Sequence, residues 1–391
     1  MIEEITSFNF NTTPRIIYGA DVAKDASPFS KLMGDRILLI TDKGLTNLGL
    51  YGDFLKDLEK NNVKVTVFDD VEADPSLKTL EKAISFGKDI ACTGVVGFGG
   101  GSSMDVAKLT ALVLGSGEDL ESAWGVANAK GPRLPLCLIP TTAGTGSEVT
   151  PVSIITVDGD EKRGVSSPII LPDFAVLDPT LTLGLPAATT AATGIDAMVH
   201  AIEAYASKNK NNNPMSGILA KEALVLLGGS IRTAVSDPKN LQARGKMLLG
   251  STLAGMAFAN SPVAAVHALA YPLGGSFHIT HGLSNALVLP AVLRFNAVDA
   301  WAAKKYAELF PFLFPNEEMG NNNQTNASLF IEKLTVLSKE LGLPQKLREV
   351  SIPEDACASM AKDAMKQTRL LINNPRELSE RDAYDIYHSI W

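Results

Sequence analysis

Cysteine and long apolar runs are scarce in this sequence of 391 residues. Its three cysteines, Cys92, Cys137 and Cys357, are widely spaced, which argues against a disulfide framework or a thiolate metal site and indicates a reducing compartment. No apolar run reaches the roughly 18 to 20 residues that span a bilayer, and the first residues lack the basic and apolar regions of a secretory signal. We therefore expect a soluble, cytoplasmic protein without a membrane partner.

Positive charge is also in the minority. The chain has 35 Lys and Arg residues against 43 Asp and Glu, which gives a net charge of -8 and a pI near 5.3. Because a polyanion is bound through clustered Lys and Arg, and no long basic run occurs here, we expect no nucleic-acid partner. Hydrophobic residues make up 46% and charged residues 20%, an ordinary globular composition, and the length favours two packed domains over one.

The first half of the chain alternates between two patterns. Amphipathic stretches typical of helices occur at 77–86 and 104–114, between short β-branched runs typical of buried strands at 37–41, 63–68, 95–98 and 136–139. Two more strands are expected at 153–157 and 174–177, around a loop that carries Lys162 and Arg163. This alternation of strand and helix predicts a parallel sheet in a Rossmann-like α/β domain over residues 1–187.

The residue pattern changes after about Pro186, where runs of β-branched residues nearly vanish. Ala- and Leu-rich segments with helical spacing follow. Helices are expected at 189–207, 216–235, 241–259, 282–295, 297–310, 327–341, 353–371 and 379–390. Asn- and Pro-rich links between them are expected to be surface loops. The second half of the chain therefore predicts an all-α domain over residues 188–391.

Two glycine-containing loops each follow a predicted strand. Gly99-Gly100-Gly101-Ser102 opens the predicted helix near Met104, so that backbone N–H groups and a helix N-terminus meet where a diphosphate can bind. Such a glycine cluster is equally typical of a tight turn. The segment 140–148 offers three threonine hydroxyls and two glycines at what should be the same edge of the sheet. Two such loops at one edge indicate an extended ligand.

Asp42 ends the first clear strand. An acidic side chain at this place accepts hydrogen bonds from an adenosine ribose and repels a 2′-phosphate, which favours NAD over NADP. An ordinary turn aspartate explains the position equally well.

Histidine is rare but clustered. The chain has five, and four of them, His200, His267, His278 and His281, fall within one stretch. Asp196 and His200 are four residues apart and so project from one face of a helix, as metal-binding pairs do. His267 and His281 would complete a four-ligand site, although a single buried histidine is more often a hydrogen-bonded core residue. Three imidazoles and one carboxylate suit a divalent ion, and these ligand types do not separate Fe²⁺ from Zn²⁺.

Together these motifs resemble those of the iron-containing (group III) alcohol dehydrogenase family over essentially the whole chain. The resemblance rests on several specific segments. They are Gly99 to Asp105 with Lys108, Pro140 to Glu148, Ala192 to Glu203, Val266 to Gly275, His281-Gly282 and the tail Asn374-Pro375-Arg376.

The resemblance implies a dehydroquinate synthase-like two-domain fold, with an N-terminal Rossmann-like α/β domain and an all-α C-terminal domain. It implies an NAD-dependent dehydrogenase that interconverts a small alcohol and its aldehyde or ketone, as a homodimer that exchanges residues 7–18. The implied metal is usually Fe²⁺, with Zn²⁺ as the alternative, and its ligands would be Asp196, His200, His267 and His281. The implied NAD-binding residues are Asp42, Gly100, Gly101, Ser102, Asp105, Thr141, Thr142, Thr145 and Lys162.

Two departures from the family pattern concern the reaction centre. Many relatives carry a second histidine four residues after the third ligand, where this chain has Tyr271, and Val152 replaces an asparagine found beside the cofactor in some of them. In the expected mechanism the metal binds the substrate oxygen and hydride passes to the nicotinamide. Tyr271 and His278 are the candidates for proton transfer, and a place at the rim of the substrate pocket explains His278 equally well.

Three alternatives stay open. The same architecture supports a lyase, a zinc-dependent polyol dehydrogenase or a transhydrogenase with tightly held cofactor. A metallohydrolase would use the ion to activate water and would need no dinucleotide. A non-catalytic nucleotide sensor would bind NAD without turnover. The identity of the alcohol and the direction of the reaction in the cell do not follow from the fold.

Overall fold

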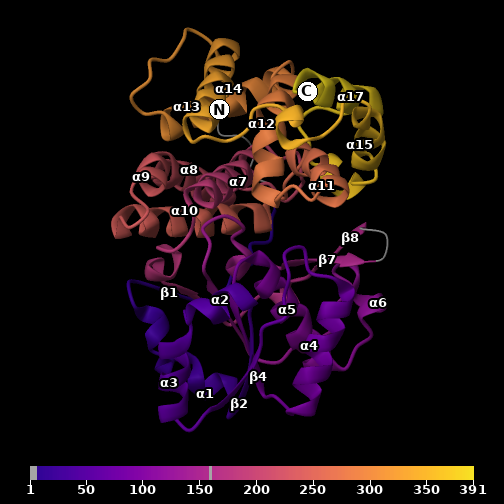
Figure 1. The fold of residues 1–391 in the computed structure, drawn as a ribbon. Helices are drawn as coiled ribbons and strands as arrows, with labels where there is room; N and C mark the ends of the chain where they lie inside the picture. The colour runs from indigo at the N-terminus through magenta and orange to yellow at the C-terminus, as the bar shows by residue number, and fades with distance from the viewer. Residues whose placement is uncertain (1–6, 158–160) are drawn as a thin grey trace. The chain divides into compact units, whose positions relative to one another are not determined.

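The computed structural model describes residues 7–157 and 161–391. The chain divides into two compact units: one comprises residues 11–184, and the other comprises residues 185–391 with the described residues before Asn11 (Figure 1). Two hydrogen bonds tie the start of the chain to the second unit, since the backbone N–H of Asn9 donates to Asn211 Oδ1 and Asn211 Nδ2 donates to the backbone oxygen of Asn9, both at 2.9 Å.

Six parallel strands form the main sheet of the first unit. In spatial order they are β1 (Arg15–Tyr18), β9 (Phe174–Leu177), β6 (Leu136–Pro140), β4 (Gly94–Gly99), β2 (Arg36–Ile40) and β3 (Lys64–Phe68). Every residue of β4 is buried, as a central parallel strand covered on both faces requires. The predicted parallel sheet is confirmed, and β1 is an edge strand beside β9.

Successive side chains of each strand point to opposite faces of this sheet, and helices bury the side chains on both faces. Ile37 of β2 packs into a core with Phe54 of α3 (Gly52–Lys60), whereas Leu38 packs into the opposite core with Leu80 of α4 (Leu77–Asp89) and Leu109 of α5 (Gly101–Ser116). Figure 1 shows α4 and α5 on one side of β2 and β4, and α3 with α1 (Ser27–Met33) on the other. The unit also contains α2 (Lys43–Leu48), α6 (Leu120–Ala123) and 3₁₀ turns at Val22–Lys24, Ser147–Val149, Pro168–Ile170 and Pro179–Thr182.

A second, smaller sheet corrects one expectation. It consists of β5 (Gly125–Val126), β8 (Glu161–Ser166) and β7 (Val152–Val157). Lys162 and Arg163 were expected in a loop, but they lie in β8, where they pair antiparallel with Thr156 and Ile155 of β7. Charged side chains disfavour strands in isolation, and here the backbone pairing with β7 overrides that preference while the long side chains lie partly exposed.

The described residues of the second unit form helices joined by loops, and none of them forms a strand. Its helices are α7 (Ala187–Tyr205), α8 (Pro214–Gly228), α9 (Ile231–Ser236), α10 (Leu241–Asn260), α11 (Ala265–Phe277), α12 (His281–Asn296), α13 (Ala300–Leu313), α14 (Asn323–Glu340), α15 (Ala356–Ala364), α16 (Thr368–Leu371) and α17 (Glu380–Ser389), with a 3₁₀ turn at Leu347–Val350. No single helix among the described residues is long and apolar enough to cross a membrane, and only α10 with α11, bent by 108°, pass that test as a pair. The predicted helical second half is confirmed.

Helix α7 is the buried centre of this unit and packs against α8, α10 and α12. Small residues allow that close packing. A Cβ added to Gly194 would lie 2.7 Å from side-chain atoms of Ile231 and Met247, and one added to Gly282 would lie 2.7 Å from the backbone oxygen of Ala192. The start of α12 therefore rests directly on the backbone of α7, and this contact determines which residues the two helices bring together.

Three helix predictions need correction. The segment 216–235 is not one helix, because α8 ends at Gly228 and α9 begins at Ile231; the intervening glycines favour a break. The segment 353–371 likewise divides into α15 and α16. No helix was expected at 265–277, where Pro272 and two following glycines weaken the pattern, yet α11 forms because its apolar side chains are buried.

Candidate metal centre and cofactor loops

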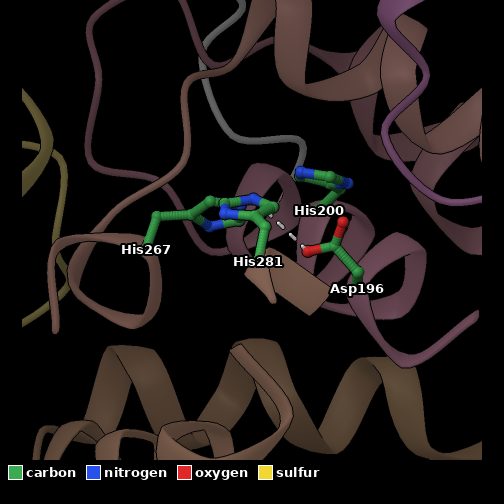
Figure 2. Close-up of side chains that lie close together, drawn as sticks. All are labelled: Asp196, His200, His267 and His281. Atoms are coloured by element: carbon green, nitrogen blue, oxygen red, sulfur yellow. Dashed lines mark ion pairs between the residues drawn. The ribbon is translucent and has the colours of Figure 1, made fainter. Parts of the chain in front are cut away.

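Asp196, His200, His267 and His281 lie together in the helical unit, and their ligand atoms are all within 4.8 Å of one another. Figure 2 shows the four side chains converging from α7, α11 and α12. The ring centroids of His200 and His267 are 4.8 Å apart, and those of His267 and His281 are 5.4 Å apart. The structure thus brings together the four residues that the sequence singled out.

Local structure explains how each of these side chains is positioned. Asp196 and His200 are one turn apart on α7, so they share a face. His267 lies in the first turn of α11, and His281 is the first residue of α12, next to the glycine that contacts the backbone of α7. His200 is further held by stacking on Phe258, with ring centroids 4.4 Å apart.

The burial of these side chains and the charge of Asp196 suit the binding of a cation. Asp196, His200 and His267 are buried, whereas the His281 side chain is 40% exposed, so the cluster is open to solvent on the His281 side. Burial by itself would raise the pKa of Asp196, but the three imidazoles and a hydrogen bond from Asn285 outweigh it, and the pKa lies below its ordinary value. The imidazole and amide neighbours of Asp196 thus favour the ionised carboxylate.

Glu203 orients one of the imidazoles and was not singled out as a functional residue from sequence. Its Oε2 is 2.6 Å from Nδ1 of His267, and its Oε1 accepts a hydrogen bond of 2.7 Å from the backbone N–H of Val266. Because a carboxylate only accepts, Nδ1 carries the proton and Nε2 of His267 keeps a free lone pair. The signal was available, since Glu203 lies three residues after His200 on the same face of α7.

Asn285 is a second residue that sequence analysis missed. It lies one turn after His281 on α12 and is completely buried. Its Nδ2 donates to Asp196 Oδ1 at 2.6 Å and lies 3.3 Å from His267 Nε2 and 3.2 Å from His281 Nε2. Its Oδ1 is buried without a hydrogen-bond partner. Its spacing of four from His281 was the available sequence signal.

The chemistry of the donor set fits a divalent ion. One carboxylate and three imidazoles suit Fe²⁺ or Zn²⁺, and no thiolate is present in the group. Metal–ligand distances of about 2.0–2.2 Å would require the most widely separated of these atoms, up to 4.8 Å apart, to move closer together. The carboxylate–histidine pair of Glu203 and His267 is the kind of outer support that such sites commonly have.

The two glycine loops meet at one edge of the main sheet in the first unit. Gly99 and Pro140 are paired residues at the ends of β4 and β6, and Thr141 donates its backbone N–H to Gly99 at 3.0 Å. A Cβ on Gly101 would lie 2.9 Å from Cγ2 of Thr145, and one on Gly100 would lie 3.7 Å from Cγ2 of Thr142. The prediction that both loops lie at the same edge is confirmed. Gly100 precedes α5, and no side chain at this N-cap position accepts a hydrogen bond from the first N–H groups of α5.

Lys108 and Asp105 connect the two loops beneath this edge. Lys108 is fully buried, and its Nζ donates to Ser147 Oγ and the Val152 backbone oxygen at 2.7 Å and to Thr150 Oγ1 at 3.2 Å. Asp105 accepts from Ser147 Oγ at 2.8 Å and from the N–H of Ile154 at 2.9 Å. Both carboxylate oxygens of Asp105 are thus engaged within the protein, whereas the resemblance suggested cofactor contact. Burial lowers the pKa of Lys108 to about 8 against the opposing charges of Asp105 and Glu148.

Asp42 and Lys162 lie elsewhere in the first unit. Asp42 caps α2, since its Oδ1 accepts from the N–H of Leu45 at 3.0 Å. This is the turn role that sequence analysis kept as an alternative to ribose binding. Lys162 donates to Thr156 Oγ1 at 2.9 Å and forms an ion pair of 2.6 Å with Asp74.

Tyr271 and His278 differ in their relation to the metal cluster. Tyr271 lies one turn after His267 on α11, with its ring centroid 6.3 Å from that of His281, and its hydroxyl accepts a long hydrogen bond of 3.4 Å from Arg369. His278 is exposed and lies outside the ligand group. It ends α11 in the left-handed conformation, with φ 55°. Tyr271 is therefore the candidate that borders the cluster.

Comparison with known proteins identifies the family. The family model "Iron-containing alcohol dehydrogenase" matches residues 13–179, and "Fe-containing alcohol dehydrogenase family, C-terminal" matches residues 190–391. The chain belongs to the iron-containing alcohol dehydrogenase family. The expected family and enzyme class are confirmed: this is an alcohol dehydrogenase, an oxidoreductase that interconverts alcohol and aldehyde.

Relatives of this alcohol dehydrogenase cover nearly its whole length. The long-chain-alcohol dehydrogenase 1 of Geobacillus thermodenitrificans is 41% identical over 362 residues, which are 92% of this chain and 90% of the relative. The crystal structure of a 1,3-propanediol oxidoreductase is 33% identical and covers 99% of this chain and 100% of its own, with a TM-score of 0.94. A sulfoacetaldehyde reductase from Bifidobacterium kashiwanohense, solved in complex with NAD⁺, is 27% identical, covers 98% and 99% of the two chains and has a TM-score of 0.84. The expected two-domain architecture is likewise confirmed.

Proposed function

We propose that this alcohol dehydrogenase uses NAD and a divalent metal ion to interconvert a small alcohol and its aldehyde or ketone. The observation that carries the proposal is the group of Asp196, His200, His267 and His281, three of them buried, with four ligand atoms within 4.8 Å in a chain that has five histidines. We assign Fe²⁺ to this site, with Zn²⁺ as the alternative. When bound there, such an ion supplies Lewis-acid chemistry to the substrate oxygen.

The protein's own contribution at this site is to hold the ligands ready. Glu203 keeps Nε2 of His267 unprotonated, and the stack of Phe258 on His200 fixes the plane of that ring. The exposed side of His281 is the direction from which an alcohol oxygen can approach. An ion held by these four side chains would need an open coordination position for the substrate oxygen, and the exposed side of His281 would be the place for it.

For the cofactor, we propose that the NAD diphosphate binds at the N-terminus of α5. Gly100 and Gly101 bring backbone N–H groups to the surface, and the hydroxyls of Ser102, Thr141 and Thr142 lie on the same edge of the sheet. A helix N-terminus with free N–H groups is suited to a phosphate. The structure of the sulfoacetaldehyde reductase with NAD⁺ supports this cofactor.

The other candidate NAD-binding residues differ in what they contact, and we propose different roles for them. Thr145 packs against Gly101, and we propose that it shapes the diphosphate loop. Asp42 and Lys162 stay candidates for the ribose and nicotinamide portions of NAD. Asp105 is proposed to act on the cofactor indirectly, through Ser147.

We propose Tyr271 as the group that moves the proton of the substrate hydroxyl. Arg369 donates to the phenol oxygen, so the phenol proton is free for another acceptor, such as the substrate oxygen in the direction of aldehyde reduction. His278 is exposed and is proposed as the next carrier of that proton toward solvent. When bound, NAD would supply the hydride chemistry, as acceptor in alcohol oxidation and, in its reduced form, as donor in aldehyde reduction.

The alternative functions account for fewer of the structural features than an alcohol dehydrogenase does. A metallohydrolase leaves the two glycine loops at one sheet edge without a role. A transhydrogenase or a lyase on this fold, and a nucleotide sensor, remain distinguishable by experiment because none of them yields net NADH from an alcohol.

The experiment that tests the proposal is anaerobic NADH formation with a panel of short alcohols and diols. The protein is stripped of metal and then reloaded with Fe²⁺ or Zn²⁺. NADH production that returns only with metal is the expected result. Absence of turnover in both directions, with alcohol and NAD or with aldehyde and NADH, would reject the proposal and favour the transhydrogenase or lyase.

We further propose a cytoplasmic homodimer with functional domains at 1–187 and 188–391. The edge strand β1 supports the dimer, since it pairs with β9 on one side and exposes Ile16 and Tyr18. Light scattering coupled to size exclusion measures the mass in solution, and a monomer would reject this part. Fractionation of the source cell tests the location.

A further inference from the structure

Asn285 combines two features that the packing of α12 alone does not explain. Its side chain is completely buried, and its amide nitrogen faces three of the four candidate ligand residues. Its amide oxygen is buried with no hydrogen-bond partner. A buried oxygen without a hydrogen-bond partner destabilises the folded state, so such a group in a native protein calls for an explanation.

The surroundings determine which end of the amide faces the cluster. Asp196 Oδ1 only accepts hydrogen bonds, and Nε2 of His267 is unprotonated because Nδ1 gives its proton to Glu203. An amide oxygen turned toward these atoms would meet lone pairs on each side. The NH₂ end is therefore required at this place, and the unsatisfied oxygen on the far side is the consequence.

We propose that Asn285 is a positioning residue of the metal centre that holds the ligands in binding geometry before the ion arrives. One amide hydrogen is donated to Asp196, and the other is shared by the Nε2 atoms of His267 and His281. Three ligand groups with mutually repelling lone pairs are thereby directed at one donor, in an arrangement close to that which a cation requires. This inference rests on the proposed metal site.

Preorganisation of this kind predicts an effect on metal affinity. In the absence of the amide, Asp196 would lose the 2.6 Å hydrogen bond that fixes Oδ1, and the two imidazoles would lose a common partner. Loss of an outer hydrogen bond to a ligand typically lowers metal affinity by roughly 10- to 100-fold. The residue itself does not need to touch the substrate.

The test uses Asn285→Leu, which has the same branched shape without donor or acceptor. Since Leu also removes the unsatisfied oxygen, the variant is expected to fold, and Asn285→Ala serves as the second variant. The matched control is Asn296→Ala. Asn296 is a buried asparagine on the same helix that donates to Tyr306 Oη and Asn374 Oδ1, away from the ligands.

The measurements are the Kd for Co²⁺ and Zn²⁺ by chelator competition, the visible absorption of the Co²⁺ protein, and Tm with and without ion. We expect both Asn285 variants to bind roughly 10- to 100-fold more weakly, with an altered Co²⁺ spectrum and a smaller gain in Tm on loading. Asn296→Ala should lower Tm and leave Kd and the spectrum unchanged. Wild-type Kd and spectrum in Asn285→Leu, or equal weakening in Asn296→Ala, would overturn the inference. Failure of the wild-type protein to bind any ion would instead reject the proposed metal site.

Discussion

The proposed metal site and the proposed cofactor loops are built in opposite ways. The cluster consists of specific side chains, three of them buried, whose donor atoms converge from three helices. The loops consist of backbone N–H groups and small residues at the ends of β4 and β6. In the first region the proposed function depends on which donor atoms the side chains carry. In the second it depends on glycines that carry no Cβ.

This difference determines what a substitution does in each region. Removing a ligand or its hydrogen-bond partner changes the chemistry of the helical unit directly. Adding atoms to a loop glycine changes the shape of the sheet edge, and the cofactor is expected to respond through its affinity. Variants in the two regions should therefore separate metal binding from NAD binding.

The largest effect is expected from His267→Ala. The variant loses one proposed ligand and leaves Glu203 without its imidazole partner. We expect loss of bound metal and a fall in kcat of more than about 10³-fold, because Lewis-acid catalysis contributes several kcal/mol. Metal analysis with circular dichroism checks that metal is lost and the fold retained. Full activity in this variant would refute the ligand assignment.

Tyr271→Phe is expected to lower kcat by roughly 10²-fold, the typical contribution of a positioned acid or base. The phenol proton is removed, while the ring beside His281 stays. Metal content and the Kd for NAD should be unchanged. An undiminished kcat across the pH range would remove Tyr271 from the proton path and leave its role as packing.

Glu203→Gln is expected to weaken metal binding by roughly 10- to 100-fold. The amide keeps the shape of the carboxylate but no longer enforces a proton on Nδ1 of His267. Chelator competition measures the change in Kd, and a high metal concentration should restore activity. If the activity of the variant stays low when the site is saturated with metal, Glu203 has a role beyond metal affinity.

On the cofactor side, Gly101→Ala is expected to raise the Kd for NAD by about tenfold without loss of metal. The new methyl group would lie 2.9 Å from Cγ2 of Thr145, so the loops must move apart, at a cost of about 1–3 kcal/mol typical of overpacking. Gly184→Ala is the matched control, since a Cβ there meets nothing within 4 Å. Equal NAD affinity in both variants would argue against a diphosphate at this edge.

Lys108→Met is expected to change the pH dependence of stability. Burial lowers the pKa of Lys108 to about 8 from an ordinary 10.5, so between these values the unfolded chain binds more protons than the folded one. The free energy of unfolding contributed by this group therefore rises with pH across that window, by roughly 3 kcal/mol at most. Urea unfolding from pH 7.5 to 10 should show a shallower rise in the variant. An identical slope in both proteins would show that Lys108 does not titrate there.

Sequence analysis predicted those features of the fold that depend on periodicity. The strands of the main sheet and most long helices followed from runs of β-branched residues and from apolar spacing of about four. The errors occurred where tertiary contacts overrode local preference. Lys162 and Arg163 form a strand because β7 pairs with them, and α11 continues through Pro272 because its apolar residues are buried.

The sequence by itself determined the metal-ligand candidates, because histidine is rare and a spacing of four residues places two side chains on one helix face. It also determined that two loops would lie at one sheet edge, since parallel strands end together. Only the tertiary structure assigned partners: Glu203 to His267, Asn285 to Asp196, and Asp105 to Ser147. Such contacts join helices and strands far apart in the chain, and hydrogen bonds across that separation are decided by packing rather than by any local pattern.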